Sequence, residues 1–314
     1  MMAAGVIGLG IMGKQCCRKL MESGIPVCGC DCNAQAAEQA AAEGIRTYAS
    51  PADLAQAADA VILFVPGPAE CQAVCLGSAG IAASGHEGLI VINMSTVPPE
   101  TNISLAAKLA EKNMVLVDAP VLGNPVNVGR WSLILGGSDE AYVRVREILV
   151  ALAGNEGNIF RAGAVGNGNK AKLLNNMMLG AINGCAAEIM ALAKHIGISQ
   201  QLLYEAAAAA NARTLSSAYR DVAEKIAEGS YDQPTFSLEL LKKDNMLCLE
   251  MANKAGAPCV IGNAIDYVNR RAVAQGYGKL DYTAAWLSVY DSWHKNTDHA
   301  VFPVADPFAG EPWA

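Results

Sequence analysis

A chain of 314 residues is longer than one ordinary hydrophobic core supports, so two domains are expected. Charged residues make up 17% of the chain and apolar residues 52%, a globular composition that argues against disorder. The formal net charge of -7 provides no basic patch for nucleic acid or an anionic membrane surface, so a small-molecule partner is the expectation.

Neither the first residues nor the longest apolar run has the pattern of a targeting or membrane-spanning segment. The first residues run from Met1 into a strand pattern without a preceding basic stretch, and the longest apolar run is interrupted by Lys172, Glu188 and Lys194. We therefore expect no signal peptide, no transmembrane helix and a cytoplasmic location.

The ten cysteines are candidates for a metal site or disulfides, but their spacing argues against both. Cys28, Cys30 and Cys32 alternate along one predicted strand, and residues two apart on a strand cannot surround one ion. We expect the cysteines to be small core residues and no metal to be bound. The scattered histidines are interpreted as structural or surface residues; they are His86, His195, His294 and His299.

The first predicted strand, residues 4–9, is followed by a glycine-rich turn and a helix pattern over residues 14–23. The turn reads Gly8-Leu9-Gly10-Ile11-Met12-Gly13, the Gly-x-Gly-x-x-Gly pattern of dinucleotide-binding proteins. In that pattern the first glycine permits a tight turn, the second lets a pyrophosphate approach the backbone, and the third lets the helix pack on the strand. Alone, the motif is a weak signal.

Asp31 strengthens the dinucleotide interpretation. It lies near the end of the second predicted strand, residues 27–32, about 20 residues beyond the turn, where a carboxylate can accept both hydroxyls of an adenosine ribose. An NADP site would need a cation there, so the prediction is NAD. The alternative is a surface aspartate at a strand end.

Helix and strand patterns then alternate, which predicts a doubly wound, mainly parallel sheet. Ligands bind such sheets outside the carboxyl ends of the strands, so Val65-Pro66 and Ser95-Thr96 are expected to line the nicotinamide half of the site. The loop from Asp118 to Pro125 should be rigid, since it contains two prolines and a glycine. The first domain is predicted to end at residue 163. Helices are expected at residues 34–43, 52–58, 70–75, 100–112 and 139–152, and strands at 60–65, 89–94, 115–119, 131–135 and 158–161.

The pattern then becomes wholly helical, beginning with a long helix over residues 168–197. Lys172 and Asn176 are four residues apart, so they share one face of this helix and bring an ammonium group and an amide together. The alternative is that Lys172 is a solvated lysine. Apolar residues cover so much of the remaining circumference that the helix is expected to be largely buried; they are Leu173, Leu174, Met177, Met178, Ile182, Ile189, Met190 and Leu192. Further helices are predicted at 199–211, 218–228, 238–255, 260–276 and 282–293.

Four motifs in this order resemble the β-hydroxyacid dehydrogenases, the 3-hydroxyisobutyrate dehydrogenase family, along essentially the whole chain. The motifs are Gly8-Leu9-Gly10-Ile11-Met12-Gly13, Asp118-Ala119-Pro120-Val121, Gly166-x-Gly168-x-x-x-Lys172-x-x-Asn175-Asn176, and Lys243-Asp244. The resemblance implies a Rossmann domain over residues 1–163 and a helical domain over 164–314 that carries the catalytic lysine and a dimerisation surface. It also implies a homodimer or homotetramer.

The resemblance further implies roles for three residues. Lys172 would be the general acid or base, Asn176 its positioning partner, and Lys243 a residue that closes over nicotinamide and substrate. Lys172 could donate a proton only if burial and neighbouring cations lowered its pKa from the usual value of about 10.4. From the residues alone, Lys243 could equally lie on a solvated helix face.

The predicted substrate loop departs from the family pattern. The family usually has Ser-Gly-Gly where this chain has Leu122-Gly123-Asn124, and glycine where this chain has Asn127 and Trp131. Leu122 has no hydroxyl for a substrate carboxylate. The predicted substrate contacts are Thr96, Leu122, Gly123, Asn124, Lys172, Asn176 and Lys243.

These residues predict an NAD-dependent oxidoreductase that transfers a hydride between nicotinamide and a small, anionic 3-hydroxy acid or the matching aldehyde. One alternative is a reductase of another small carbonyl, such as a sulfonated aldehyde, or of an imine. Imine-reducing relatives replace the lysine, whereas this chain retains Lys172. The other alternative, a protein that senses NAD without turnover, is disfavoured because Lys172 and Asn176 are both present.

Overall fold

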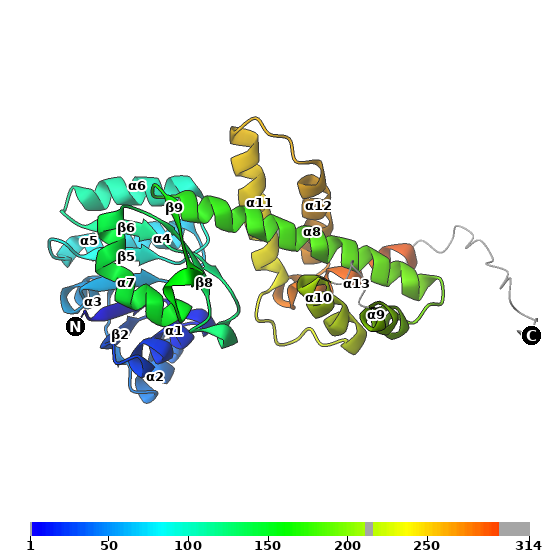
Figure 1. Ribbon diagram of the computed structural model, residues 1–314, viewed down its shortest axis with the longest axis horizontal. Coiled ribbons are helices and arrows are strands. Elements are labelled where there is room, and N and C mark those ends of the chain that lie inside the picture. The colour runs from blue at the N-terminus through cyan, green and yellow to red at the C-terminus, as the bar shows by residue number, and fades with distance from the viewer. Residues whose placement is uncertain (1, 211–215, 295–314) are drawn as a thin grey trace, which may run out of the picture. The chain divides into compact units, whose positions relative to one another are not determined.

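The computed structural model describes residues 2–210 and 216–294 (Figure 1). The chain divides into two compact units, Met1–Asn175 and Asn176–Ala314. The predicted division at residue 163 falls twelve residues before this point and stays a prediction. The predicted end of a helix at Asn211, and His299, lie outside the described residues.

The first unit is built on a single mixed sheet in which the described residues form nine strands. Their order is β3-β2-β1-β4-β5-β6-β8-β7, with β9 paired to β8. The strands from β3 to β6 are parallel, which confirms the predicted sheet, and β8 is antiparallel to β6 and β7. The strands are β1 (Ala4–Ile7), β2 (Val27–Cys30), β3 (Arg46–Thr47), β4 (Ala60–Leu63), β5 (Ile90–Asn93), β6 (Val115–Asp118), β7 (Val121–Leu122), β8 (Ser132–Gly136) and β9 (Ile159–Gly163).

Both faces of the sheet are buried at its central strands, whose residues alternate between two hydrophobic clusters. Ala4 and Val6 of β1 lie in one cluster and Ile7 lies in the other, and the residues of β4 alternate in the same way. Such two-sided burial requires helices on both faces. The helices of this unit are α1 (Ile11–Glu22), α2 (Ala34–Ala42), α3 (Pro51–Ala57), α4 (Pro68–Leu76), α5 (Ile81–Ser84), α6 (Pro99–Ala110) and α7 (Asp139–Ala153), with 3-10 turns η1 (Pro125–Asn127) and η2 (Glu156–Asn158).

The strand order changes direction beside β1, which has β2 on one side and β4 on the other. In open parallel sheets a ligand crevice forms at the carboxyl ends of the strands at such a switch point. The glycine-rich turn after β1 and the Val65-Pro66 loop after β4 therefore lie at the edge where a dinucleotide would bind.

The second unit is helical, as predicted. Its core is rich in alanine, which lets helices approach closely, and includes Met190, Val222, Ile226 and Trp286. The helix α8 (Asn167–His195) begins in the first unit and continues into the second. The other helices are α9 (Gln200–Ala209), α10 (Ser217–Glu228), α11 (Leu238–Lys254), α12 (Val260–Ala274) and α13 (Ala285–His294), with 3-10 turns η3 (Tyr277–Lys279) and η4 (Tyr282–Ala284).

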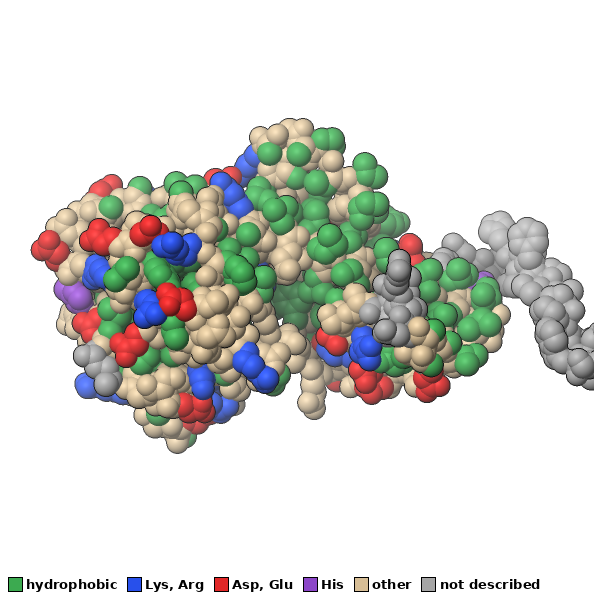
Figure 2. Space-filling model, in the orientation of Figure 1, with side chains coloured by type: hydrophobic (Ala, Val, Ile, Leu, Met, Phe, Trp, Pro, Cys, Tyr) green, Lys and Arg blue, Asp and Glu red, His purple; other side chains and the backbone are tan. Residues whose placement is uncertain are grey.

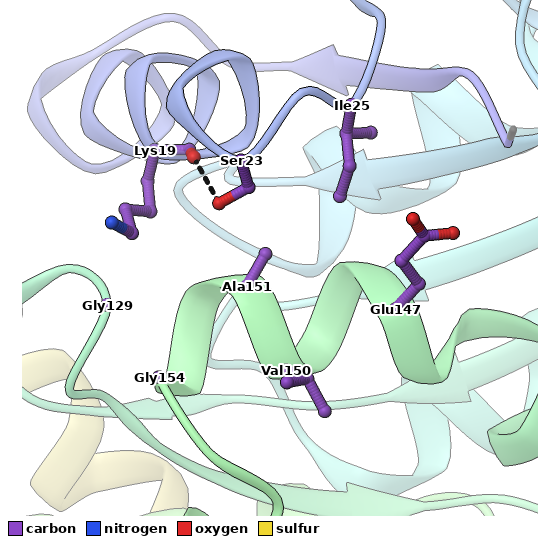
Figure 3. Close-up of a pocket in the computed structure, with 8 residues that line it drawn as sticks. All are labelled: Lys19, Ser23, Ile25, Gly129, Glu147, Val150, Ala151 and Gly154. Atoms are coloured by element: carbon purple, nitrogen blue, oxygen red, sulfur yellow. Dashed lines mark hydrogen bonds between the residues drawn. The ribbon is translucent and has the colours of Figure 1, made fainter.

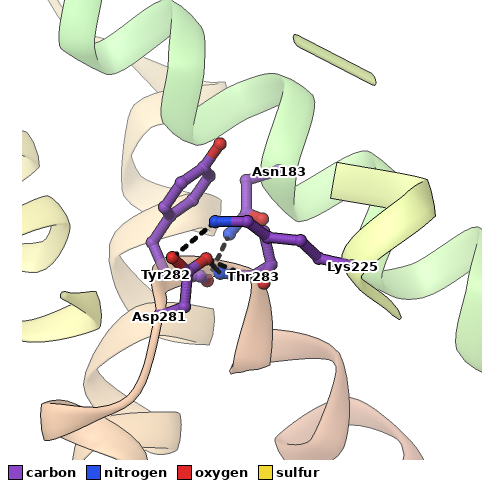
Figure 4. A network of polar contacts seen from close by, with 5 residues as sticks. All are labelled: Asn183, Lys225, Asp281, Tyr282 and Thr283. Carbon is purple, nitrogen blue, oxygen red and sulfur yellow. Dashed lines mark hydrogen bonds and ion pairs between the residues drawn. The ribbon is translucent and has the colours of Figure 1, made fainter. Parts of the chain in front are cut away.

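A polar network fixes η4 against two of these helices (Figure 4). The buried Asp281 carboxylate accepts hydrogen bonds from Lys225 Nζ at 2.7 Å and from Thr283 Oγ1 at 2.9 Å. Asn183 Nδ2 of α8 donates to the Tyr282 carbonyl at 3.0 Å. Asp281 is nearly fully buried, so its negative charge needs a partner, and Lys225 provides the positive charge. The network therefore has a structural role.

The expectation that α8 is largely buried was wrong for one of its faces. Leu173 and Met190 are buried, but Leu174, Met178, Ile189 and Leu192 are between 44% and 63% exposed. Within the described residues α8 is also long and apolar enough to cross a membrane by length and composition, although half of its most apolar window is buried. The predicted interruption of this run by Lys172, Glu188 and Lys194 is present, but the criterion allows up to two charged residues in its window, so α8 meets it. A core helix of a soluble protein meets the same criterion.

Candidate active site

At each of the three glycines of the turn after β1, a different steric feature explains why the residue is a glycine. Gly8 has φ +94°, and a side chain there would also clash with the Phe64 carbonyl. A side chain at Gly13 would clash with the Gly8 carbonyl, so α1 can pack on the strand only without one. Beside Gly10 there is open space, and it immediately precedes α1, whose N-terminal N–H groups attract an anion. The turn therefore has the shape that a pyrophosphate requires.

Asp31 lies beside this turn, with its carboxylate held by backbone donors. Its Oδ2 accepts the Leu9 N–H at 2.6 Å and its Oδ1 accepts the Asn33 N–H at 2.8 Å. The Leu9 side chain is fully buried, whereas Ile11 is exposed and Met12 half-buried. Of Leu9, only the backbone can therefore reach a cofactor at this turn.

The two loops predicted to line the nicotinamide half are joined to each other. The Val65 N–H donates to Ser95 Oγ at 2.9 Å, and the Ser95 N–H donates to Asn93 Oδ1 at 3.0 Å. Ser95 is buried, so it positions the Val65 loop from behind, whereas Thr96 is half-buried and Pro66 is exposed. Val65 is half-buried as well, so Val65, Pro66 and Thr96 are the members of this set that can reach a ligand.

The altered loop is a short strand, β7, followed by the turn η1. Gly123 and Asn124 are exposed, Leu122 is half-buried and Asn127 is exposed. Trp131 is fully buried and its Nε1–H donates to the Asn124 carbonyl at 2.8 Å. Of the residues that differ from the family pattern, Asn124 and Asn127 are therefore exposed, Leu122 is half-buried and only Trp131 is fully buried.

Asp118, at the end of β6, holds the start of α8. Its two carboxylate oxygens accept the Gly166 N–H at 2.6 Å and the Asn169 N–H at 2.7 Å, while Asn169 Oδ1 accepts the Val97 N–H at 3.0 Å. A side chain at Gly168 would lie 2.8 Å from Asp118 Oδ2. Burial raises the pKa of the Asp118 carboxyl, and the two N–H donors act against that rise. Asp118 thus fixes the helix that carries Lys172 to the sheet.

Lys172 is half-buried on α8 and Asn176 follows one turn later, where it is 3% exposed. In the second unit Asn176 Nδ2 donates to Asp244 Oδ2 at 2.6 Å, and Lys243 Nζ lies 3.2 Å from Asp244 Oδ1. A carboxylate can only accept, so the amide of Asn176 must turn Nδ2 toward Asp244 and Oδ1 away from it. Asp244 therefore brings together two of the predicted site residues, Asn176 and Lys243.

Sequence reasoning gave no role to Asp118 or Asp244, although both lie in the quoted motifs. Apart from Lys243, which adjoins Asp244, their partners are 48 or more residues away along the chain, so no local pattern reveals them. The available signal was chemical and held for Asp118 alone, a carboxylate at the end of an apolar strand, because a buried carboxylate needs donors. Asp244 is flanked by Lys243 and Asn245, which give no such signal.

One hollow of the first unit lies away from these residues. It has a volume of about 510 Å³ and lies between the end of α1 and the end of α7 (Figure 3). The cofactor turn is at the opposite end of α1, about 18 Å away for a helix of 12 residues. The hollow therefore does not serve the predicted site. It is lined by Lys19, Ser23, Ile25, Gly129, Glu147, Val150, Ala151 and Gly154.

Most of the cysteines lie in the hydrophobic core. Burial raises the pKa of the Cys17 thiol to about 12 and that of Cys28 and Cys30 to about 11, which keeps these thiols protonated and unreactive. Across residues 2–210 and 216–294, no three metal-ligating side chains are grouped. The buried cysteines are Cys16, Cys17, Cys28, Cys30, Cys71, Cys75 and Cys248.

Two family models cover most of the chain. Residues 3–165 match the NAD-binding domain of 6-phosphogluconate dehydrogenase, and residues 166–289 match the NAD-binding model of NADP-dependent 3-hydroxyisobutyrate dehydrogenase. The chain belongs to the 3-hydroxyisobutyrate dehydrogenase family. Its members are oxidoreductases that use a nicotinamide dinucleotide and act on small hydroxy acids.

Individual members of the 3-hydroxyisobutyrate dehydrogenase family match along nearly their whole length. L-threonate dehydrogenase of Cupriavidus necator is 31% identical over 89% of this chain and 93% of its own. The 3-sulfolactaldehyde reductase of Escherichia coli is 30% identical over 90% of this chain and 94% of its own. The crystal structure of a 3-hydroxyisobutyrate dehydrogenase from Salmonella typhimurium matches with a TM-score of 0.83 at 27% identity, covering 91% of this chain and 99% of that one.

Proposed function

We propose that this protein is an NAD-dependent oxidoreductase that interconverts a small, anionic 3-hydroxy acid and the corresponding aldehyde or semialdehyde. The observation that carries the proposal is α8, which Asp118 fixes to the sheet and which presents Lys172 and Asn176 one turn apart. An ammonium group and an oriented amide on a fixed helix meet the requirement for a positioned acid or base.

In the proposed arrangement residues 1–163 bind the cofactor and residues 164–314 carry the catalytic lysine. The glycine-rich turn would hold the pyrophosphate and Asp31 the adenosine ribose, while Pro66 and Thr96 lie on the nicotinamide side. The Asp31 carboxylate favours NAD, since it can accept ribose hydroxyls and repels a 2'-phosphate. When bound, the nicotinamide ring supplies or accepts the hydride.

Lys172 gives a proton to the substrate oxygen during reduction and takes it back during oxidation. Asn176, with its amide oriented by Asp244, positions the groups around Lys172, and Lys243 adds a positive charge for an anionic substrate. Leu122 cannot donate to an anion, so the backbone N–H groups of Gly123 and Asn124 replace the missing hydroxyl.

The substrate is drawn from the acids and aldehydes on which relatives act. L-threonate is the first candidate, because L-threonate dehydrogenase is the most similar of the relatives compared above. The 2- and 3-hydroxyl groups of L-threonate are secondary, so with this substrate the hydride transfer would give a keto acid in place of an aldehyde. A sulfonated aldehyde is the second candidate, because a 3-sulfolactaldehyde reductase matches over 90% of the chain and the loop lacks the serine that resemblance associates with carboxylates.

The test is a spectrophotometric assay at 340 nm with purified protein and NAD or NADH. L-threonate and 3-hydroxyisobutyrate are offered for oxidation and 3-sulfolactaldehyde for reduction. We expect turnover of at least one compound that depends on Lys172. Tight binding of NADH without turnover of any compound would instead support a sensor of NAD.

We also propose a cytoplasmic homodimer or homotetramer. Figure 2 shows hydrophobic side chains gathered over the part of the second unit that α8, α11 and α12 form. Met178, Ile189 and Leu192 lie on one face of α8 at spacings that fit a helical stripe, and an exposed apolar stripe of this kind is typical of an interface between subunits.

A further inference from the structure

The indole of Trp131 is fully buried beneath the altered substrate loop. Its Nε1–H donates to the Asn124 carbonyl at 2.8 Å, and the same carbonyl accepts the Asn127 N–H at 3.0 Å. The Asn124 carbonyl oxygen is therefore hydrogen-bonded both to the indole and to the turn η1. The loop backbone also packs directly on the ring, because a side chain at Gly123 would lie 2.7 Å from Trp131 Cδ1.

On another side, the indole contacts the loop that follows β4. The rings of Trp131 and Phe64 meet edge to face, with centroids 6.2 Å apart. Phe64 directly precedes Val65, which is hydrogen-bonded to Ser95, and the Phe64 carbonyl lies against Gly8 of the dinucleotide turn. The indole thus touches the substrate loop and the start of the nicotinamide loop, and all of these residues belong to the first unit.

We propose that Trp131 is a positioning residue that determines substrate specificity, by fixing Gly123 and Asn124 relative to Val65 and Pro66. The inference rests on the proposed function, in which the first pair holds the substrate anion and the second lines the nicotinamide side. A glycine, which the family pattern usually has where this chain has Trp131, could make none of these contacts. Because the indole is buried and its N–H is hydrogen-bonded, it holds the substrate loop at a fixed distance from the nicotinamide loop. Only an acid whose length matches that distance then fits.

The test uses Trp131→Phe, which keeps an aromatic ring but removes the hydrogen bond to Asn124. In the absence of any substrate, we expect backbone hydrogen exchange over residues 121–129 to become roughly fivefold faster or more, the loss expected for one hydrogen bond of about 1 kcal/mol. For whichever panel compound the wild type turns over fastest, KM should rise by a similar factor. The Kd for NADH and kcat should stay within about twofold, a split that general destabilisation would not give.

Trp286→Phe is the matched control. Trp286 is also buried and donates through Nε1 to Tyr231 Oη at 2.7 Å, but it lies in the second unit. This variant should lose stability without changing exchange over residues 121–129 or the substrate KM. The proposal is overturned if Trp131→Phe changes neither quantity, or if both variants raise KM equally.

The two hypotheses fail in different ways. If the wild type turns over none of the three compounds, the proposed substrate class is wrong. Exchange over residues 121–129 in the substrate-free protein then still decides whether Trp131 positions the loop, since that measurement needs no activity.

Discussion

Lys172 and Lys170 lie two residues apart on α8 but in different surroundings. Lys172 is half-buried, whereas Lys170 is exposed and donates to Asn167 Oδ1 at 3.0 Å. We predict that Lys172→Met lowers kcat by roughly 10² to 10⁴ and leaves NADH binding nearly unchanged, the usual contribution of a positioned acid or base. Lys170→Met is the control and should retain activity. A variant at Lys172 with normal kcat and weakened NADH binding would reassign that residue to the cofactor.

Asp31 should determine the choice between NAD and NADP. Its carboxylate sits beside the glycine-rich turn, held by the N–H groups of Leu9 and Asn33. We predict at least about tenfold higher kcat/KM with NAD than with NADP, equivalent to about 1.4 kcal/mol. Asp31→Ala should lower kcat/KM with NAD and reduce this preference. Equal use of the two cofactors by the wild type would remove Asp31 from the site.

Whether a residue's position could be predicted from the sequence depended on how far along the chain its contacts lie. The position of Asp31 beside the glycine-rich turn was predictable because one strand-turn-helix-strand unit, which is local, sets the distance between them. Asp118 and Asp244 act on Gly166, Asn169 and Asn176, and those pairings exist only once the sheet and helices have packed. The family resemblance placed these residues in motifs but did not show what their carboxylates bind.

At the scale of elements, α8 depends on Asp118 for its start. Asp118→Ala leaves the Gly166 and Asn169 N–H groups unpaired in a buried place, so we predict a loss of about 3 kcal/mol in the free energy of unfolding. Urea denaturation monitored by circular dichroism measures this loss. Asp139→Ala is the matched control, because Asp139 also lies at a helix start but its side chain is 83% exposed, and there the loss should be below about 1 kcal/mol. Equal losses in the two variants would contradict the anchoring role.

The altered loop allows a prediction about substrate choice. Leu122→Ser restores a hydroxyl where the family usually has one, and we expect it to raise kcat/KM for 3-hydroxyisobutyrate. A charge-assisted hydrogen bond contributes about 1.5 to 3 kcal/mol, so the increase should be roughly tenfold or more. Asn124→Ala should lower kcat/KM for the substrate that the wild type prefers. High wild-type activity on 3-hydroxyisobutyrate, together with a neutral Asn124→Ala, would show that the departures do not affect specificity.

Elements were predictable where they were long enough to show a period. All the predicted strands of the first unit are present, with ends that differ by one or a few residues. The strands β3 and β7 were missed because two residues cannot show an alternation, and α5 because a helix of four residues completes little more than one turn. The predicted rigid loop after Asp118 contains β7, whose pairing with β8 depends on a later part of the chain.

At the scale of the whole molecule, the fold class was predictable because alternation of helix and strand followed by helices alone leaves few arrangements. Exposure was less predictable. An apolar stripe on α8 has the same sequence pattern whether it packs inside its own chain or against another, and Met178, Ile189 and Leu192 are exposed within this chain. The spacing of apolar residues along the sequence identifies the helix. Which element covers each face of the helix depends on the other elements that can pack there.

This stripe provides the last prediction. If subunits associate through α8, a charge at its centre must be buried without a partner, which costs several kcal/mol for each subunit. We predict that Ile189→Lys shifts the protein from a dimer or tetramer toward a monomer in size-exclusion chromatography with light scattering. Val143→Lys is the control, since Val143 is 68% exposed but lies on α7 of the first unit, and it should leave the mass unchanged. A monomeric wild type, or an oligomer that Ile189→Lys does not disturb, would show that subunits do not meet at this face of α8.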